Sequence, residues 1–209
     1  VEPKVITLQV TPALEHWLLK VAVCANEIPD FGVFTQVLPL EDVSVEESDL
    51  ILRLGAKLEG DPFVAVMGSE ELVIVGSYEV PVSDLSLDNL QAIYTGDYGY
   101  WTDIPEAKEA GSTANQAIKI MSYPPGDEIE SLFNKIYMDD QRRISPDAQY
   151  YLTVDFLKIL LTESPAGLGY LLRSQVPEGL QMIEITGDVH SSNVFVLAIT
   201  KEKPVDQLG

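Results

Sequence analysis

Short β-rich runs alternate with amphipathic helical segments along the 209-residue chain, and this alternation constrains the fold more than any other feature. The first unit is the apolar run at residues 5–10, followed by Thr11-Pro12, where threonine can cap a helix and proline fits its first turn. One apolar helical face then follows at spacings of three and four: Leu14, Trp17, Leu18, Val21, Ala22 and Ala25. Such alternation predicts an α/β fold with a parallel or mixed sheet.

The same pattern continues to the end of the chain. Helices are expected at residues 86–96, 129–137 and 147–161. Strands are expected at 34–40, 49–54, 72–75, 118–121, 167–172, 180–185 and 194–200. In α/β sheets, ligands bind at the carboxyl ends of strands and beside helix N-termini, so the loops at residues 10–14 and 123–129 are the candidate ligand loops.

The charge of the chain limits its partners. Thirteen basic residues against 33 acidic ones give a net charge of −20, a field that repels nucleic acid and anionic membranes. No apolar run is long enough to span a bilayer. Cys24 is the only cysteine, so an internal disulfide is excluded, and its place on the apolar helical side predicts a buried thiol.

Residues 86–101 combine a helix with defined ends and a following aromatic anchor. Ser86 can cap the start, Gly96 can end the helix in a left-handed conformation, and Trp101 lies in the next loop. Leu87, Leu90 and Ile93 supply helical spacing between them. The segment resembles the Leu-Ser-x-x-Gln-Leu-x-x-Ile-Phe-x-Gly-x-x-x-x-Trp stretch of periplasmic phosphate-binding and related extracellular solute-binding proteins.

Three further segments resemble the same family in the same order. Residues 10–14, Val-Thr-Pro-Ala-Leu, are similar to its first ligand loop. Residues 165–171, Pro-Ala-Gly-Leu-Gly-Tyr-Leu, are similar to its Pro-Gly-Ala-Ile-Gly-Tyr strand, and residues 196–204 to its last strand and the Lys-x-x-Pro that follows. The resemblance implies a type 2 periplasmic-binding-protein fold: two α/β lobes with mixed sheets, joined by a hinge, with a cleft between them. It places lobe 1 at residues 1–79 and 180–209, and lobe 2 at 80–179.

The loop before the second expected helix departs from the family pattern. The family has Arg-x-x-Gly-Ser-Gly-Thr, whereas this chain has Tyr123 for the arginine, Asp127 for the serine and Ile129 for the threonine, and retains only Gly126. An arginine fork suits a tetrahedral oxyanion, and a phenol removes both its charge and its paired donors. Phosphate, sulfate and molybdate are therefore not the expected ligands.

The resemblance to the family, together with the departures from its loop sequence, predicts a set of ligand-binding residues. Each also has a structural alternative: Thr11 as a helix cap, Asp127 as a favourable charge in a first helical turn, Tyr123 as packing, and Arg53 as a partner of the acidic loop before it. The expected set is Thr11, Arg53, Ser122, Tyr123, Gly126, Asp127 and Tyr170.

By this resemblance, the expected function is that of an extracytoplasmic solute-binding protein. It would be periplasmic or held at the cell surface by a lipid anchor, monomeric, and would deliver a small molecule to an ABC transporter permease. The alternative is a ligand-sensing or protein-interaction domain on the same fold. An enzyme is not expected, because no nucleophile triad, phosphate loop or metal cluster is visible. No cofactor or metal is expected; His16 and His190 have no partner ligand at metal-binding spacing.

Overall fold

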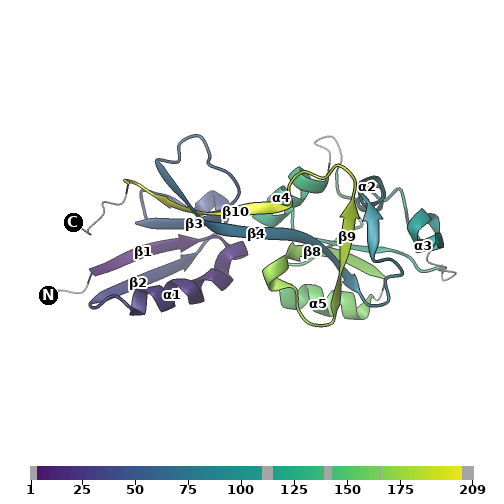
Figure 1. Ribbon diagram of the computed structural model, residues 1–209, viewed down its shortest axis with the longest axis horizontal. Coiled ribbons are helices and arrows are strands. Elements are labelled where there is room, and N and C mark those ends of the chain that lie inside the picture. Colours follow the sequence, from purple (N-terminus) through teal and green to yellow (C-terminus); the bar gives the residue numbers. More distant parts are fainter. Residues whose placement is uncertain (1–3, 110–114, 139–142, 165, 204–209) are drawn as a thin grey trace. The chain divides into compact units, whose positions relative to one another are not determined.

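Two compact units make up the chain. The computed structural model describes residues 4–109, 115–138, 143–164 and 166–203 (Figure 1). One unit comprises Val1–Ser69 with Val194–Gly209, and the other comprises Glu70–Asn193. The lobe boundaries expected near residues 80 and 180 differ from these positions. Among the described residues, the strand that contains residues 180–186 pairs with residues 74–77 and 84–86, all in the second unit.

The first unit is a mixed sheet with one helix packed against β2. β1 lies between its parallel neighbours β2 and β3, and β10 runs antiparallel to β3. Thr11 and Pro12 follow β1 directly and start a 3-10 helix that leads into α1. The elements are β1 (Lys4–Val10), the 3-10 helix Pro12–Trp17, α1 (Leu18–Asn26), β2 (Phe31–Val37), the 3-10 turn Leu40–Asp42, β3 (Leu50–Leu54), the beginning of β4 (Phe63–Ser77) and β10 (Asn193–Thr200).

The second unit has a mixed sheet in the order β4-β8-β6-β7, with β9 pairing with both β4 and β5. β8 and β9 are antiparallel to β4, whereas β6 is parallel to β8. Besides the rest of β4, the elements are β5 (Asp84–Ser86), α2 (Leu87–Thr95), the 3-10 turn Trp101–Asp103, α3 (Pro105–Glu109), β6 (Lys119–Ser122), α4 (Glu128–Tyr137), β7 (Gln149–Tyr150), α5 (Val154–Glu163), β8 (Gly167–Leu172), the 3-10 turn Arg173–Gln175 and β9 (Leu180–Thr186).

An aromatic cluster forms much of the core of the second unit. Phe133 stacks on Tyr170, with ring centroids 3.9 Å apart and planes inclined by 13°. Trp101 is fully buried beside this core, and its indole Nε1–H donates to the carbonyl oxygen of Ala166 at 3.0 Å. The cluster comprises Tyr94, Tyr123, Phe133, Tyr137, Tyr151 and Tyr170.

Most expected elements are present, and the α/β class with a mixed sheet is confirmed. The helix expected to begin at residue 147 starts at Val154 instead, because the Thr153 hydroxyl caps it by accepting from the N–H of Phe156. The residues before it form β7 and carry Tyr151 into the aromatic cluster. The expectation that Cys24 is buried is wrong, because its side chain is exposed. Within α1, the buried residue is its neighbour Ala25.

Gly96 ends α2 as its spacing indicates. Its φ of 87° lies in the left-handed region, and its N–H donates to the carbonyl oxygen of Ile93. A Cβ at this position would lie 3.2 Å from Ser145 Oγ. Gly96→Ala is therefore expected to lower the free energy of unfolding by about 1 kcal/mol, measured by urea denaturation. Gly99 has a conventional φ and open space around a Cβ, so equal losses for Gly99→Ala and Gly96→Ala would contradict this explanation.

Within the described residues, none of the helices is both long and apolar enough to cross a membrane.

Candidate functional site

The loop that leads into α4 is shaped by a tight turn. Its sequence, Tyr123-Pro124-Pro125-Gly126-Asp127, places proline and then glycine at the two central positions. The N–H of Asp127 donates to the carbonyl oxygen of Pro124 at 3.1 Å, and Gly126 has a φ of 89°. Proline followed by a residue with positive φ is the pattern of a type II turn, so the retained glycine has a conformational reason to be there.

Carboxylates of the chain itself occupy the N-terminal end of α4. The side chain of Asp127 caps the helix, its Oδ1 accepting from the N–H of Ile129 at 2.8 Å. Oε2 of Glu130 accepts from the N–H of Gly126 at 3.3 Å, and Glu128 is buried in the same turn. In an anion-binding site, the backbone donors of a helix N-terminus would face the ligand. Here two of the donors in this region are hydrogen-bonded to the chain's own acidic groups.

Three of the expected site residues lie inside the core of the second unit. Ser122 and Tyr170 are fully buried, and Tyr123 is 7% exposed. Ser122 Oγ donates to the carbonyl oxygen of Tyr123 at 2.8 Å and lies 2.7 Å from the Tyr170 hydroxyl oxygen. Burial, followed by the nearby charge of Asp127, raises the pKa of Tyr123, so its phenol remains neutral. These groups adjoin the α4 loop and form its buried support; their contact with a ligand stays a prediction.

Thr11 lies at the carboxyl end of β1, in the first unit. Its N–H donates to the carbonyl oxygen of Leu52 at 3.1 Å, which joins the loop to β3. Thr11 occupies the cap position of the 3-10 helix, yet its hydroxyl makes no capping hydrogen bond. The residue is fully buried, and Oγ1 has no hydrogen-bond partner among the described residues. A buried hydroxyl without a partner carries a desolvation cost that a bound ligand could remove.

Arg53 lies in β3 on the same sheet face as Ile51 and Ile199, rather than at an open strand end. It is only 4% exposed. Its Nη2 lies 2.5 Å from Oδ2 of Asp61, and its Nη1 donates to the carbonyl oxygen of Leu54 at 3.1 Å. Oδ2 of Asp61 also accepts from the N–H of Leu58 at 2.7 Å, so the ion pair fixes the loop between β3 and β4. The partner of Arg53 thus follows it in sequence, in the loop between β3 and β4, whereas the sequence pointed to the acidic loop before it.

The structure groups the expected residues by unit. Ser122, Tyr123 and Tyr170 are in mutual contact, and the α4 loop with Gly126 and Asp127 continues from them. Thr11 directly follows β1 and Arg53 lies in β3, the parallel neighbour of β1 in the first unit. Sequence reasoning missed two groups, Glu130 and Asp61. The spacing Asp-x-x-Glu of residues 127–130 is a capping signal that could have identified Glu130, whereas Asp61 required knowledge of the loop path.

The side chains at these loops are arranged for hydrogen bonding. They comprise neutral hydroxyls, a carboxylate that caps a helix start and an arginine paired with a carboxylate. Across residues 4–109, 115–138, 143–164 and 166–203, no group of three or more histidine, cysteine, aspartate or glutamate side chains is arranged to hold a metal ion.

Several solved structures share this architecture. A putative phosphate ABC transporter substrate-binding protein from Clostridium perfringens, solved with bound phosphate, superposes with a TM-score of 0.78 at 16% identity, covering 95% of this chain and 87% of that one. An ABC-type phosphate transport receptor from Vibrio cholerae gives a TM-score of 0.74 at 14% identity, with coverages of 97% and 89%. The chain has a phosphate-binding-protein-like fold. Two pieces of the sequence resemblance, Pro165 and Pro204, lie outside the described residues.

The phosphate-binding-protein-like fold is also shared with regulatory proteins. The reduced regulatory domain of OxyR2 from Vibrio vulnificus matches with a TM-score of 0.63 at 11% identity, covering 98% of this chain and 90% of that one. No protein-family model matches the sequence. No curated protein matches it either. At these identities the comparisons establish the fold, and the ligand has to be argued from this chain's own residues.

Proposed function

We propose that this protein is an extracytoplasmic solute-binding protein that delivers a small neutral or cationic molecule to an ABC transporter permease. Binding would close the two lobes about a hinge and involve no chemical step. The fold supports a binding role, and the solved structures named above as transport receptors share it along nearly the whole chain. A monomer is sufficient for this role, and no nucleic acid is involved, in keeping with the net charge of −20.

The occupied N-terminus of α4 is the observation that carries the ligand assignment. An incoming dianion would meet the carboxylate of Asp127 at the helix cap and that of Glu130 over the Gly126 N–H. Each repulsion between unit charges at 4 Å costs about 1 kcal/mol in water and about 4 kcal/mol near a protein surface. Arg53, another residue expected to contact a ligand, is already paired with Asp61. The proposed ligand is therefore not phosphate, sulfate or molybdate.

A ligand-sensing domain is the second candidate function, favoured by the match to an OxyR2 regulatory domain. Both functions need a ligand, but they differ in the partner that responds to the ligand-bound protein. Co-purification of the natural full-length protein with an ABC permease would support transport, whereas attachment to a DNA-binding or signalling module would support sensing.

A thermal-shift panel tests the proposed function, because a ligand that binds only the folded state raises the melting temperature. Phosphate, sulfate and molybdate are expected to leave it unchanged, while a sugar, nucleoside, amino acid or amine is expected to raise it saturably. Saturable stabilisation by phosphate at micromolar concentrations would contradict the ligand assignment. An unchanged melting temperature with every compound would contradict the transport proposal.

Asp127→Ser isolates the electrostatic argument. Serine can retain the helix cap, so the fold should persist, while one negative charge leaves the loop. Phosphate affinity is expected to rise about threefold to tenfold above the wild-type value, measured by titration calorimetry at low ionic strength. Asp88→Ser is the matched control, since Asp88 is an acidic residue in the first turn of α2. An equal gain in both variants would indicate a non-specific effect of net charge.

A further inference from the structure

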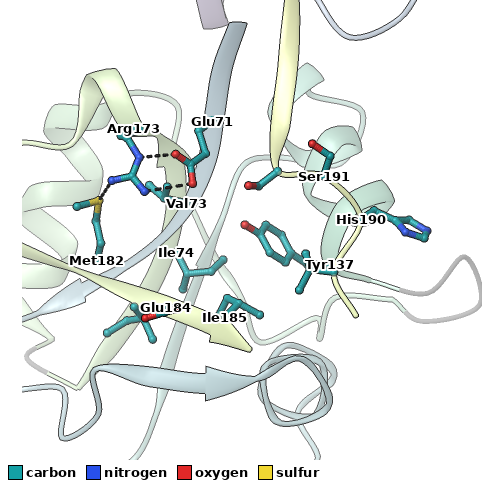
Figure 2. A pocket seen from close by; sticks show the side chains of 13 residues that line it. Glu71, Val73, Ile74, Tyr137, Arg173, Met182, Glu184, Ile185, His190 and Ser191 are labelled. Carbon is teal, nitrogen blue, oxygen red and sulfur yellow. Dashed lines mark hydrogen bonds and ion pairs between the residues drawn. The ribbon is translucent and has the colours of Figure 1, made fainter. Parts of the chain in front are cut away.

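A pocket of about 500 Å³ lies within the second unit, where β9 leaves β4 (Figure 2). β9 pairs with β4 through Ile183 and then pairs with β5 from Glu184 to Thr186. The space between the diverging strands is bordered by the end of α4 and by the segment before β10. Its volume falls within the range of small-molecule sites, about 300–1,000 Å³. It contains none of the residues that the sequence nominated for ligand binding.

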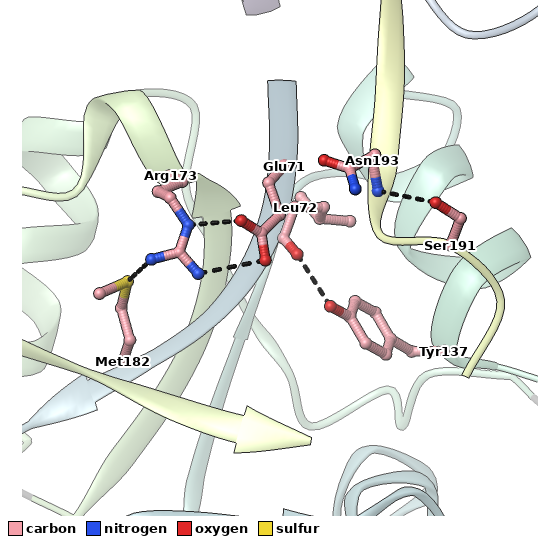
Figure 3. A network of polar contacts seen from close by, with 7 residues as sticks. All are labelled: Glu71, Leu72, Tyr137, Arg173, Met182, Ser191 and Asn193. Carbon is pink, nitrogen blue, oxygen red and sulfur yellow. Dashed lines mark hydrogen bonds and ion pairs between the residues drawn. The ribbon is translucent and has the colours of Figure 1, made fainter. Parts of the chain in front are cut away.

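Aliphatic side chains supply the apolar part of this pocket: Val73, Ile74, Ile183, Ile185 and Val189. The backbone of β4 beside them is already hydrogen-bonded. The N–H of Leu72 donates to the carbonyl oxygen of Ser192 at 2.9 Å, and its carbonyl oxygen accepts from the Tyr137 hydroxyl at 2.8 Å (Figure 3). A ligand therefore meets a closed apolar surface there rather than an open strand edge.

The donors of the pocket are largely committed to partners. Arg173 Nε and Nη2 donate to the two carboxylate oxygens of Glu71 at 2.5 and 3.1 Å, and Nη1 points to Sδ of Met182 at 3.2 Å (Figure 3). The Tyr137 hydroxyl donates to Leu72, and burial, followed by the charge of Glu71, raises its pKa to about 12. The phenol therefore stays neutral.

Negative charge remains after this pairing. Arg173 neutralises Glu71, whereas Glu184 adds a second carboxylate to the lining. In Figure 2 the His190 ring is directed away from Tyr137, so it does not balance this charge. The Glu184 carboxylate offers acceptor oxygens, and the field of a chain with a net charge of −20 further favours a cation.

We propose that this pocket binds a small organic cation, a primary amine carried on an apolar body. The apolar body would cover the aliphatic side chains, and the ammonium would donate to the carboxylate of Glu184. The site is separate from the α4 loop on which the transport proposal rests.

Matched six-carbon probes test this assignment: hexylamine, hexanol and hexanoate. The ε-methyl of Met182 reports from inside the pocket by carbon-13 NMR, and the chain's other methionines, Met67, Met121 and Met138, serve as internal references. Hexylamine is expected to shift the Met182 signal saturably, hexanol to bind at least fivefold more weakly, and hexanoate to cause no shift. Equal binding of the three probes, or no shift at Met182, would overturn the proposal.

Glu184→Gln tests the charge itself. The substitution keeps the shape of the side chain and is expected to weaken hexylamine binding at least fivefold, with little effect on hexanol. Glu178→Gln is the control, since Glu178 is exposed in the same unit and does not line the pocket. Unchanged hexylamine affinity in Glu184→Gln would contradict the assignment of the pocket to an organic cation. A panel ligand that stabilises the protein, together with no Met182 shift on adding hexylamine, would support the transport proposal and overturn this one.

Discussion

Trp101→Ala is expected to lower the free energy of unfolding by about 4 kcal/mol, through loss of a large buried side chain. The indole is fully buried between the turn after α2 and the segment that enters β8. Its removal leaves a cavity and also deprives the carbonyl oxygen of Ala166 of its donor. Trp101→Phe retains most of the apolar contact but not the N–H, and is expected to lose about 1–2 kcal/mol.

The second tryptophan offers the comparison. Trp17 is half-buried in the first unit, beneath Lys20, so Trp17→Ala is expected to lose clearly less stability than Trp101→Ala. Urea unfolding followed by circular dichroism gives the differences. Because each unit contains one tryptophan, fluorescence of Trp101→Phe and Trp17→Phe would also report each unit separately. A loss below about 2 kcal/mol for Trp101→Ala would show that the site collapses around the cavity.

Local signals predicted the ends of helices well where the cap residues decided them. Ser86 accepts from the N–H of Asn89, and Gly96 takes the left-handed conformation, both as expected from residue type and spacing. The strand at residues 72–75 was recognised, but β4 extends from Phe63 to Ser77. Its middle, Gly68-Ser69-Glu70-Glu71, has the composition of a loop, and only its neighbouring strands explain its extended conformation.

The candidate site shows the same division between local and distant causes. Asp127 was recognised as a favourable charge in a first helical turn, and it caps α4. Ser122, Tyr123 and Tyr170 were predicted as ligand contacts from their position in the sequence. All three contact Tyr151, a residue of the helix expected at 147–161, and all three are buried. The pocket beside β9 had no sequence signal, since its walls come from segments about a hundred residues apart.

The second large expected effect on stability comes from comparing two arginine–carboxylate ion pairs. Both have a nitrogen–oxygen distance of 2.5 Å, but they differ in burial. Arg53 and Asp61 are 4% and 14% exposed, whereas Arg173 and Glu71 are 50% and 33% exposed. Asp61→Asn would leave the Arg53 guanidinium buried beside a neutral amide, so a loss of about 3 kcal/mol in unfolding free energy is expected. Glu71→Gln breaks a solvated pair and is expected to cost at most about 1 kcal/mol.

Acid titration tests the more exposed pair further. Hydrogen bonds from Arg173 hold the pKa of Glu71 below its ordinary value of 4.5, despite some burial. A carboxyl whose pKa is lowered by folding contributes stability above its unfolded pKa, and that contribution is lost as the pH falls through the folded value. Glu71→Gln should therefore reduce the loss of stability below pH 4.5 while changing little at neutral pH. Urea midpoints at several pH values measure both variants, and equal losses at neutral pH would show that burial does not control the strength of these pairs.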